Sequence, residues 1–130
     1  MPDRDRTEGE RLARRLFGDQ RYAKSRAAAP DRARRRLLAF ADEIVFGRVY
    51  SRAGLTLPER SMCTVAALTV LREPVQLRAH IGGALNVGVT QERIEEIITQ
   101  MAMYAGFPAA LNAMAVLDDV IASRAPGSPG

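Results

Sequence analysis

The stretch Thr90–Asn112, TQERIEEIITQMAMYAGFPAALN, decides the fold of this chain. Its apolar residues recur at three- and four-residue spacing, which forms one continuous stripe on an α-helix. Thr90 is a suitable N-cap, because its side-chain oxygen can accept a hydrogen bond from a backbone N–H of the first turn. Gly106 predicts the left-handed end of this helix, and Pro108 predicts the start of the next one. The stripe consists of Ile94, Ile97, Ile98, Met101, Ala102 and Ala105.

The rest of the chain follows the same helical periodicity, and no segment shows the two-residue alternation of a β-strand. The sequence therefore predicts an all-α fold of about six helices. Gly47 is expected to interrupt one of them and to begin an irregular stretch. Beyond the central helix, we expect helices over residues 5–17, 31–46, 57–71, 74–88 and 108–123, with a connector over residues 19–30.

The segment SMCTVAALTVL, residues 61–71, is apolar on nearly every side. Such a helix is predicted to be buried in the core and in a subunit interface. Cys63 lies within it and is interpreted as a core residue. As the single cysteine of the chain, it cannot form an internal disulfide, so nothing implies an oxidising compartment. The chain also lacks an apolar run of bilayer length and a signal-peptide core, so we expect a cytoplasmic protein with no membrane partner.

Positive charge is concentrated at the N-terminus. Residues 1–36 hold 12 Arg or Lys against 6 Asp or Glu, a balance of +6, whereas residues 37–130 hold 7 against 9, a balance of −2. The arginines alternate with acidic and small residues, and few aromatic residues accompany them. This pattern favours a solvated helical face or intersubunit contacts, and we expect no nucleic-acid partner.

His80 is the only histidine of the chain. One imidazole cannot supply the two or three ligands of a typical catalytic zinc site, so no metal is expected. On its helix, His80 shares a face with Gln76 and Ala84, and Gly83 is adjacent, so the small neighbours could leave space for a ligand. A pKa near 6.5 would suit a proton donor or acceptor. The alternative is a partly buried histidine bonded to a carbonyl group.

Other polar residues have both a functional and a structural interpretation. Tyr104 beside the Gly106 turn could present its hydroxyl to a ligand, although an aromatic residue there is often part of the core. Arg52 and Arg60 flank the start of the apolar helix and could bind an anion or form salt bridges at an interface. Glu96 is either solvated or turned inward.

The sequence resembles the carboxymuconolactone decarboxylase family, which includes the alkylhydroperoxidase D-like proteins. Three segments carry the resemblance: FGRVYSRAGLTLPERSMCTVAALTVL, HIGGALNVGVTQERIEEI and YAGFPAALNAM. They occur in the family's order and spacing between about residues 40 and 120.

The resemblance implies an alkylhydroperoxidase D-like helical bundle whose subunits form homotrimers or homohexamers, with active sites near subunit contacts. It also predicts the organisation of the chain. We expect an Arg-rich helix and connector over residues 1–30, the family domain over residues 31–124, and a flexible tail over residues 125–130.

The redox branch of the family uses a Cys-x-x-Cys-x-x-x-His motif. Counted back from His80, the two cysteine positions are Glu73 and Gln76, and the glutamate position of that branch is Ser61. Peroxide reduction through this motif is therefore excluded, and Cys63 lies elsewhere and cannot replace it.

The decarboxylase branch is the better match. The resemblance implies that it converts γ-carboxymuconolactone, an intermediate of aromatic catabolism, to an enol-lactone with loss of CO₂ and without a metal or organic cofactor. Arg52 and Arg60 would hold carboxylates of a small anionic substrate, His80 would donate a proton, and Tyr104 would bond the lactone or enolate oxygen. Glu96 would orient His80. A related lactone or β-keto acid is an alternative substrate, and a peroxide-reducing or non-catalytic binding protein is an alternative function.

Overall fold

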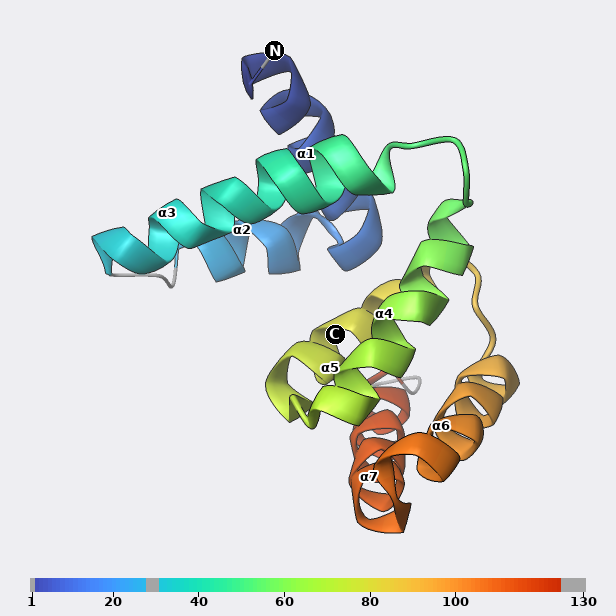
Figure 1. Ribbon diagram of the computed structural model, residues 1–130. Helices are drawn as coiled ribbons and strands as arrows, with labels where there is room; N and C mark the ends of the chain where they lie inside the picture. Colours follow the sequence, from blue (N-terminus) through green and yellow to red (C-terminus); the bar gives the residue numbers. More distant parts are fainter. Residues whose placement is uncertain (1, 28–30, 125–130) are drawn as a thin grey trace. The chain divides into compact units, whose positions relative to one another are not determined.

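The computed structural model describes residues 2–27 and 31–124, and the predicted tail lies outside them. Those residues form seven α-helices and one π-helical segment, so the all-α class is confirmed, with more helices than expected (Figure 1). The chain divides into two compact units between Leu57 and Pro58. The elements are α1 (Pro2–Phe17), α2 (Asp19–Ala27), α3 (Arg32–Phe40), η1 (Ala41–Tyr50), α4 (Leu57–Leu71), α5 (Pro74–Asn86), α6 (Gln91–Ala105) and α7 (Phe107–Ser123).

The joint between α6 and α7 forms as the sequence predicts. The Thr90 side chain accepts a hydrogen bond from the backbone N–H of Arg93 at 3.3 Å and caps α6. Gly106 ends the helix with a φ of 93°, and its N–H donates to the carbonyl oxygen of Ala102 at 2.9 Å. Pro108 lies in the first turn of α7. The chain therefore changes direction sharply between α6 and α7 (Figure 1).

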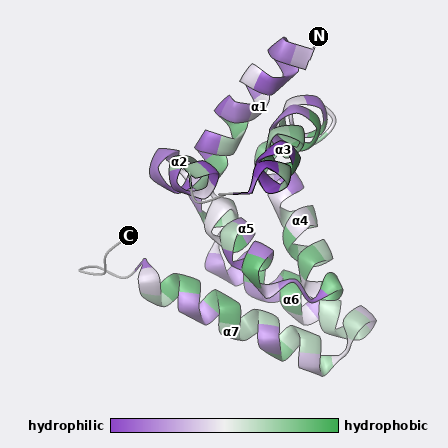
Figure 2. Cartoon of the chain, turned by 90° about the vertical axis from the view of Figure 1, so that its left-hand side faces the viewer, coloured by the Kyte–Doolittle hydropathy of each residue, from purple (hydrophilic) through white to green (hydrophobic). Residues whose placement is uncertain are grey.

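The core of the second unit is built on α7, against which both α5 and α6 pack. On α6, three of the six residues of the predicted stripe are buried and the other three are half-buried. Figure 2 shows that α4–α7 carry more hydrophobic residues than α1–α3. The buried core residues are Val65, Leu77, Ile81, Ala84, Val89, Ile94, Ile98, Ala102, Ala110, Ala113, Leu117 and Val120.

Helix α4 is not buried on all sides in this chain. Its fully buried residues are Ser61, Val65 and Thr69, which recur every four residues and define one face. Cys63 is exposed, so its assignment to the core is wrong for the single chain. Position 63 lies about 200° around the helix from Ser61, and composition alone could not reveal which face would be covered.

In the first unit, the predicted connector over residues 19–30 is largely a helix. Gly18 adopts a φ of 87° and separates α1 from α2, which runs from Asp19 to Ala27. Helix α2 buries a single residue, Tyr22. The apolar periodicity was too sparse to indicate this helix, because its burial depends on one aromatic side chain. The rest of the predicted connector, residues 28–30, lies outside the described residues.

Gly47 does not interrupt its helix. Asp31 caps α3, because its side chain accepts a hydrogen bond from the backbone N–H of Ala33 at 2.9 Å. The chain then continues through Gly47 as the π-helical η1. A Cβ atom on Gly47 would overlap the carbonyl oxygen of Asp5 on α1, and one on Gly9 would overlap that of Asp42. The glycines therefore serve the close approach of α1 to η1 and do not end a helix.

The apolar side of α3 and η1 is largely exposed. Only Phe46 and Tyr50 among its large apolar residues are buried. Their rings pack edge to face, with the ring centroids 5.0 Å apart. The segment is helical, as the spacing of its apolar residues predicts, but most of these residues are not buried. The exposed members are Leu37, Phe40, Ile44, Val45 and Val49.

Every helix within residues 2–27 and 31–124 falls short of the length and apolar character required to cross a bilayer.

Candidate functional site

Helix α5 positions His80. Pro74 opens the helix, and Leu77, Ile81 and Ala84 turn into the core, with 0 to 2% of each side chain exposed. His80 precedes Ile81 and is half-buried as a result. The imidazole is thus held at the edge of the core of the second unit, on a helix fixed by apolar packing.

Burial lowers the pKa of His80 to about 4, because the charged imidazolium is poorly solvated there. At neutral pH the imidazole is therefore uncharged. A neutral imidazole can accept a proton, but it is not the ready proton donor that an ordinary pKa would provide. At neutral pH, His80 would act as an acid if a nearby negative charge raised its pKa.

The stability of the protein is expected to fall between pH 6.5 and pH 4. An unfolded histidine binds a proton near pH 6.5, whereas folded His80 does so only at about 4. Above this window both states are neutral and stability is fully retained. Within it the unfolded state binds more protons, so lowering the pH favours unfolding, by about 2 kcal/mol at pH 5.

Urea unfolding of wild type and His80→Asn at pH 7 and pH 5 measures this contribution. Asparagine does not titrate, so the variant should lack the component that the wild type loses. An equal loss of stability in both proteins would show that His80 does not have a lowered pKa.

The small residues near His80 on α5 do not lie on an exposed surface. Gly82, Gly83 and Ala84 are all buried, whereas Gln76 is exposed. The small residues therefore face the packed interior, whereas Gln76, one turn before His80, is exposed.

Glu96 and Tyr104 lie two turns apart on one face of α6, and both are exposed. Glu96 lines a cavity of about 440 Å³ together with Met62, Arg93 and Met103. Tyr104 is 75% exposed, so it is not the core aromatic that one interpretation of the sequence favoured. The carboxylate and the hydroxyl are both available to a ligand or to another protein surface.

The two candidate substrate-binding arginines belong to different units. Arg60 is half-buried on α4 in the second unit, together with His80, Glu96 and Tyr104. Arg52 is exposed in the turn that follows η1, in the first unit. Four of the five predicted site residues are therefore carried by the same compact unit.

Arg72 is a polar residue whose role the sequence did not indicate. It adopts a φ of 59°, rare for a residue other than glycine, and its guanidinium donates to the carbonyl oxygen of Ala105 at 3.1 Å. It lines a small cavity of about 140 Å³ with Thr69, Glu73 and Asn112. The hydrogen bond ties the turn between α4 and α5 to the end of α6, which indicates a structural role.

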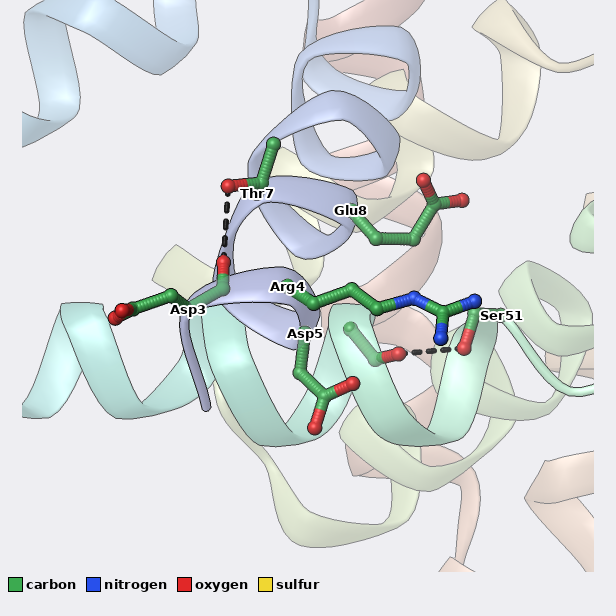
Figure 3. A pocket seen from close by; sticks show the side chains of 7 residues that line it. Asp3, Arg4, Asp5, Thr7, Glu8 and Ser51 are labelled. Atoms are coloured by element: carbon green, nitrogen blue, oxygen red, sulfur yellow. Dashed lines mark hydrogen bonds between the residues drawn. The ribbon is translucent and has the colours of Figure 1, made fainter. Parts of the chain in front are cut away.

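A wide pocket of about 760 Å³ lies in the first unit, between the start of α1 and the end of η1 (Figure 3). Three carboxylates, Asp3, Asp5 and Glu8, line it with the single cation Arg4. This excess of negative charge is unsuited to an anionic substrate, and none of the predicted site residues lines the pocket. This pocket is therefore not the candidate site, although it is large.

Within the described parts of the chain, no three His, Cys, Asp or Glu side chains gather in a group that could hold a metal ion.

The helical fold and the position of His80 on α5 define the class of protein. It is an all-α protein with a half-buried histidine on a core helix. Its single cysteine cannot form a Cys-x-x-Cys pair. The sequence model of the carboxymuconolactone decarboxylase family matches residues 35–119, and the chain belongs to that family. The resemblance of the sequence to this family is thereby confirmed.

Three curated relatives match part of the chain. It is 37% identical over 81 residues to a 4-carboxymuconolactone decarboxylase of Acinetobacter baylyi, covering 62% of this chain and 60% of the relative. It is 40% identical over 85 residues to an uncharacterised 15.0 kDa protein of Paracoccus denitrificans, covering 63% of each chain. A nitrosuccinic acid decarboxylase of Metarhizium robertsii is 34% identical over 79 residues, covering 61% and 55%. The chain thus spans about three-fifths of the length of these relatives.

Proposed function

We propose that the protein decarboxylates a small carboxylated lactone of the γ-carboxymuconolactone type, or a related β-keto acid, without a cofactor. The observation that carries the proposal is the half-buried His80, held neutral on a core helix. Two relatives named as decarboxylases support it, as does the absence of a second cysteine from the sequence.

The reaction exchanges one carboxylate for one proton. The bond between the substrate carbon and its carboxylate breaks, CO₂ leaves, and the electron pair remains on the substrate as a dienolate. A proton must then be delivered to carbon. Groups that stabilise the developing negative charge and groups that supply the proton are both needed.

His80 is suited to the proton transfer. A substrate carboxylate beside the ring would raise the pKa of His80 from about 4, because an opposite charge favours the imidazolium. The ring would take up a proton from water as the anion binds and deliver it to carbon after CO₂ leaves. Delivery of this proton to carbon leaves His80 neutral again, and the product then departs. Because the pKa of His80 is low in the absence of substrate, protonation of the imidazole is coupled to substrate binding.

We assign the remaining tasks of the reaction to the other candidate residues. Arg60 would hold a substrate carboxylate as a guanidinium–carboxylate pair, and the sequence resemblance assigns the same kind of role to Arg52. Tyr104 would donate its hydroxyl to the lactone or enolate oxygen. Glu96 would orient the imidazole, provided that it lies beside His80 in the assembled protein.

We also propose that the protein is a homo-oligomer, a trimer or hexamer as the family resemblance implies. Large apolar side chains around the joint of α6 and α7 are exposed in the single chain, and a second subunit could cover them. Analytical ultracentrifugation measures the assembly, and a monomer at micromolar concentration would contradict the proposal. The exposed residues are Met103, Tyr104, Phe107 and Leu111, each at least 66% exposed.

The function is tested by mixing the purified protein with γ-carboxymuconolactone and following CO₂ release. We expect release that scales with enzyme concentration. Cys63→Ser should retain full activity, because no thiol takes part. Absence of release at high enzyme concentration, with this lactone and with β-keto acids, would support a non-catalytic binding protein. Loss of activity in Cys63→Ser would contradict the proposed mechanism.

A further inference from the structure

A second concentration of functional groups lies in the first unit, separate in the chain from His80. Helices α1, α2 and α3 and the start of η1 enclose a cavity of about 290 Å³. Four of the residues that line it are arginines: Arg6, Arg14, Arg26 and Arg35. We call this cavity the arginine pocket.

The arginine pocket is built around a buried carboxylate. Asp42 is 3% exposed and accepts a hydrogen bond from the hydroxyl of Tyr22 at 2.7 Å. The guanidinium of Arg26 also donates to both oxygens of Asp42, through Nη2 and through Nε. Arg26 thereby neutralises Asp42, and the pair forms a charged but balanced part of the pocket wall.

Tyr22 fixes two of the arginines. The Cζ atoms of Arg14 and Arg26 lie 4.4 and 4.3 Å from the centre of its ring, which is within cation–π distance. Burial and the hydrogen bond to Asp42 raise the pKa of Tyr22 to about 12, so the phenol stays neutral and keeps donating. The guanidinium of Arg14 is thus held in place before any ligand arrives.

The arginines that line the arginine pocket outnumber its carboxylates. Arg6 pairs with Glu10 at 3.3 Å, so two of the four arginines are matched by the two carboxylates that line the pocket. Arg14 reaches only Asp19 at 3.7 Å, and Asp19 is 85% exposed, so that pair is weak. Arg35 has no ion-pair partner among the described residues. The lining therefore carries a formal excess of two positive charges.

We propose that the arginine pocket binds a compact dianion, a small molecule with a phosphate group or two carboxylates, whose oxygens pair with Arg14 and Arg35. A guanidinium presents two parallel N–H donors that fit either kind of anion. Two such groups facing one partly enclosed cavity favour a doubly charged ligand over chloride. The cavity also has room for an organic portion.

The arginine pocket is independent of the proposed decarboxylation. Five of its nine lining residues precede the family match, which begins at residue 35, and the other four lie at the start of that match. The whole pocket lies in the first unit, whereas His80 lies in the second. A dianion bound there would join α1, α2 and α3, and so would stabilise the first unit.

Calorimetric titration of the full chain tests the proposal, with sodium phosphate in one arm and sodium succinate in the other. Ionic strength is held constant with sodium chloride, because weak surface attraction is screened by salt. We expect saturable binding of at least one dianion. Binding of phosphate alone assigns the site to phosphate compounds, binding of succinate alone assigns it to dicarboxylates, and binding of both assigns it to compact dianions in general.

Arg35→Ala should weaken this binding at least tenfold. Arg36→Ala is the matched control, since it removes the same charge from the next position of α3, which does not line the pocket. Both positions are exposed, so both variants should fold, as circular dichroism would verify. Failure of both dianions to bind, or equal weakening by the two variants, would overturn the proposal.

Discussion

Replacing His80 with alanine is expected to lower the rate of CO₂ release by at least about 100-fold while the protein stays folded. The imidazole is half-buried at the edge of the core, so its removal deletes little apolar packing. Its chemical role would have no substitute, because the chain contains no other histidine. The expected signature is a large fall in kcat with a small change in melting temperature.

Two further variants separate a catalytic from a structural role. His80→Gln preserves a polar side chain of similar reach but cannot carry the proton, so it should be as inactive as His80→Ala. Arg60→Ala should raise KM more than it lowers kcat, because a group that holds the substrate carboxylate contributes mainly to binding. If His80→Ala loses melting temperature and activity in parallel, the imidazole is a packing residue.

Gly9→Ala is expected to destabilise the first unit by about 3 kcal/mol. A Cβ atom at this position would overlap the carbonyl oxygen of Asp42, which belongs to the backbone of η1 and cannot move aside as a side chain would. Helix α1 would have to separate from η1. This shift would also disturb Asp42 and its hydrogen bond from Tyr22.

Gly54→Ala is the matched control. It adds the same methyl group within the first unit, where nothing lies within 4 Å of the new atom. Hydrogen exchange followed by mass spectrometry should show lost protection in α1 and η1 of Gly9→Ala, with α6 and α7 unchanged, since the chain divides into two compact units. Equal protection in both variants would show that α1 and η1 are not in such close contact.

The sequence predicted the joint of α6 and α7 well because its signals are local. An N-cap such as Thr90 and a left-handed glycine such as Gly106 act within one helical turn, so their structural meaning does not depend on the rest of the chain. The redox branch was excluded for the same reason, since a missing cysteine pair is visible in the residues themselves.

Burial was predicted less well because it depends on which surfaces meet. Cys63 has the composition of a core residue and is exposed, because the covered face of α4 is set by Ser61, Val65 and Thr69. Tyr22 lies in a predicted connector and is buried, because it contacts an aspartate twenty residues away.

The sequence by itself determined the all-α class, the family and the identity of the single imidazole. Each of these depends on the order of residues along the chain and not on distance in space. Only the tertiary structure decided that His80 is neutral at pH 7 and that four arginines share one pocket. A pKa follows from burial and from neighbouring charges, and a pocket forms where helices distant in sequence come together, so both arise only when the chain has folded.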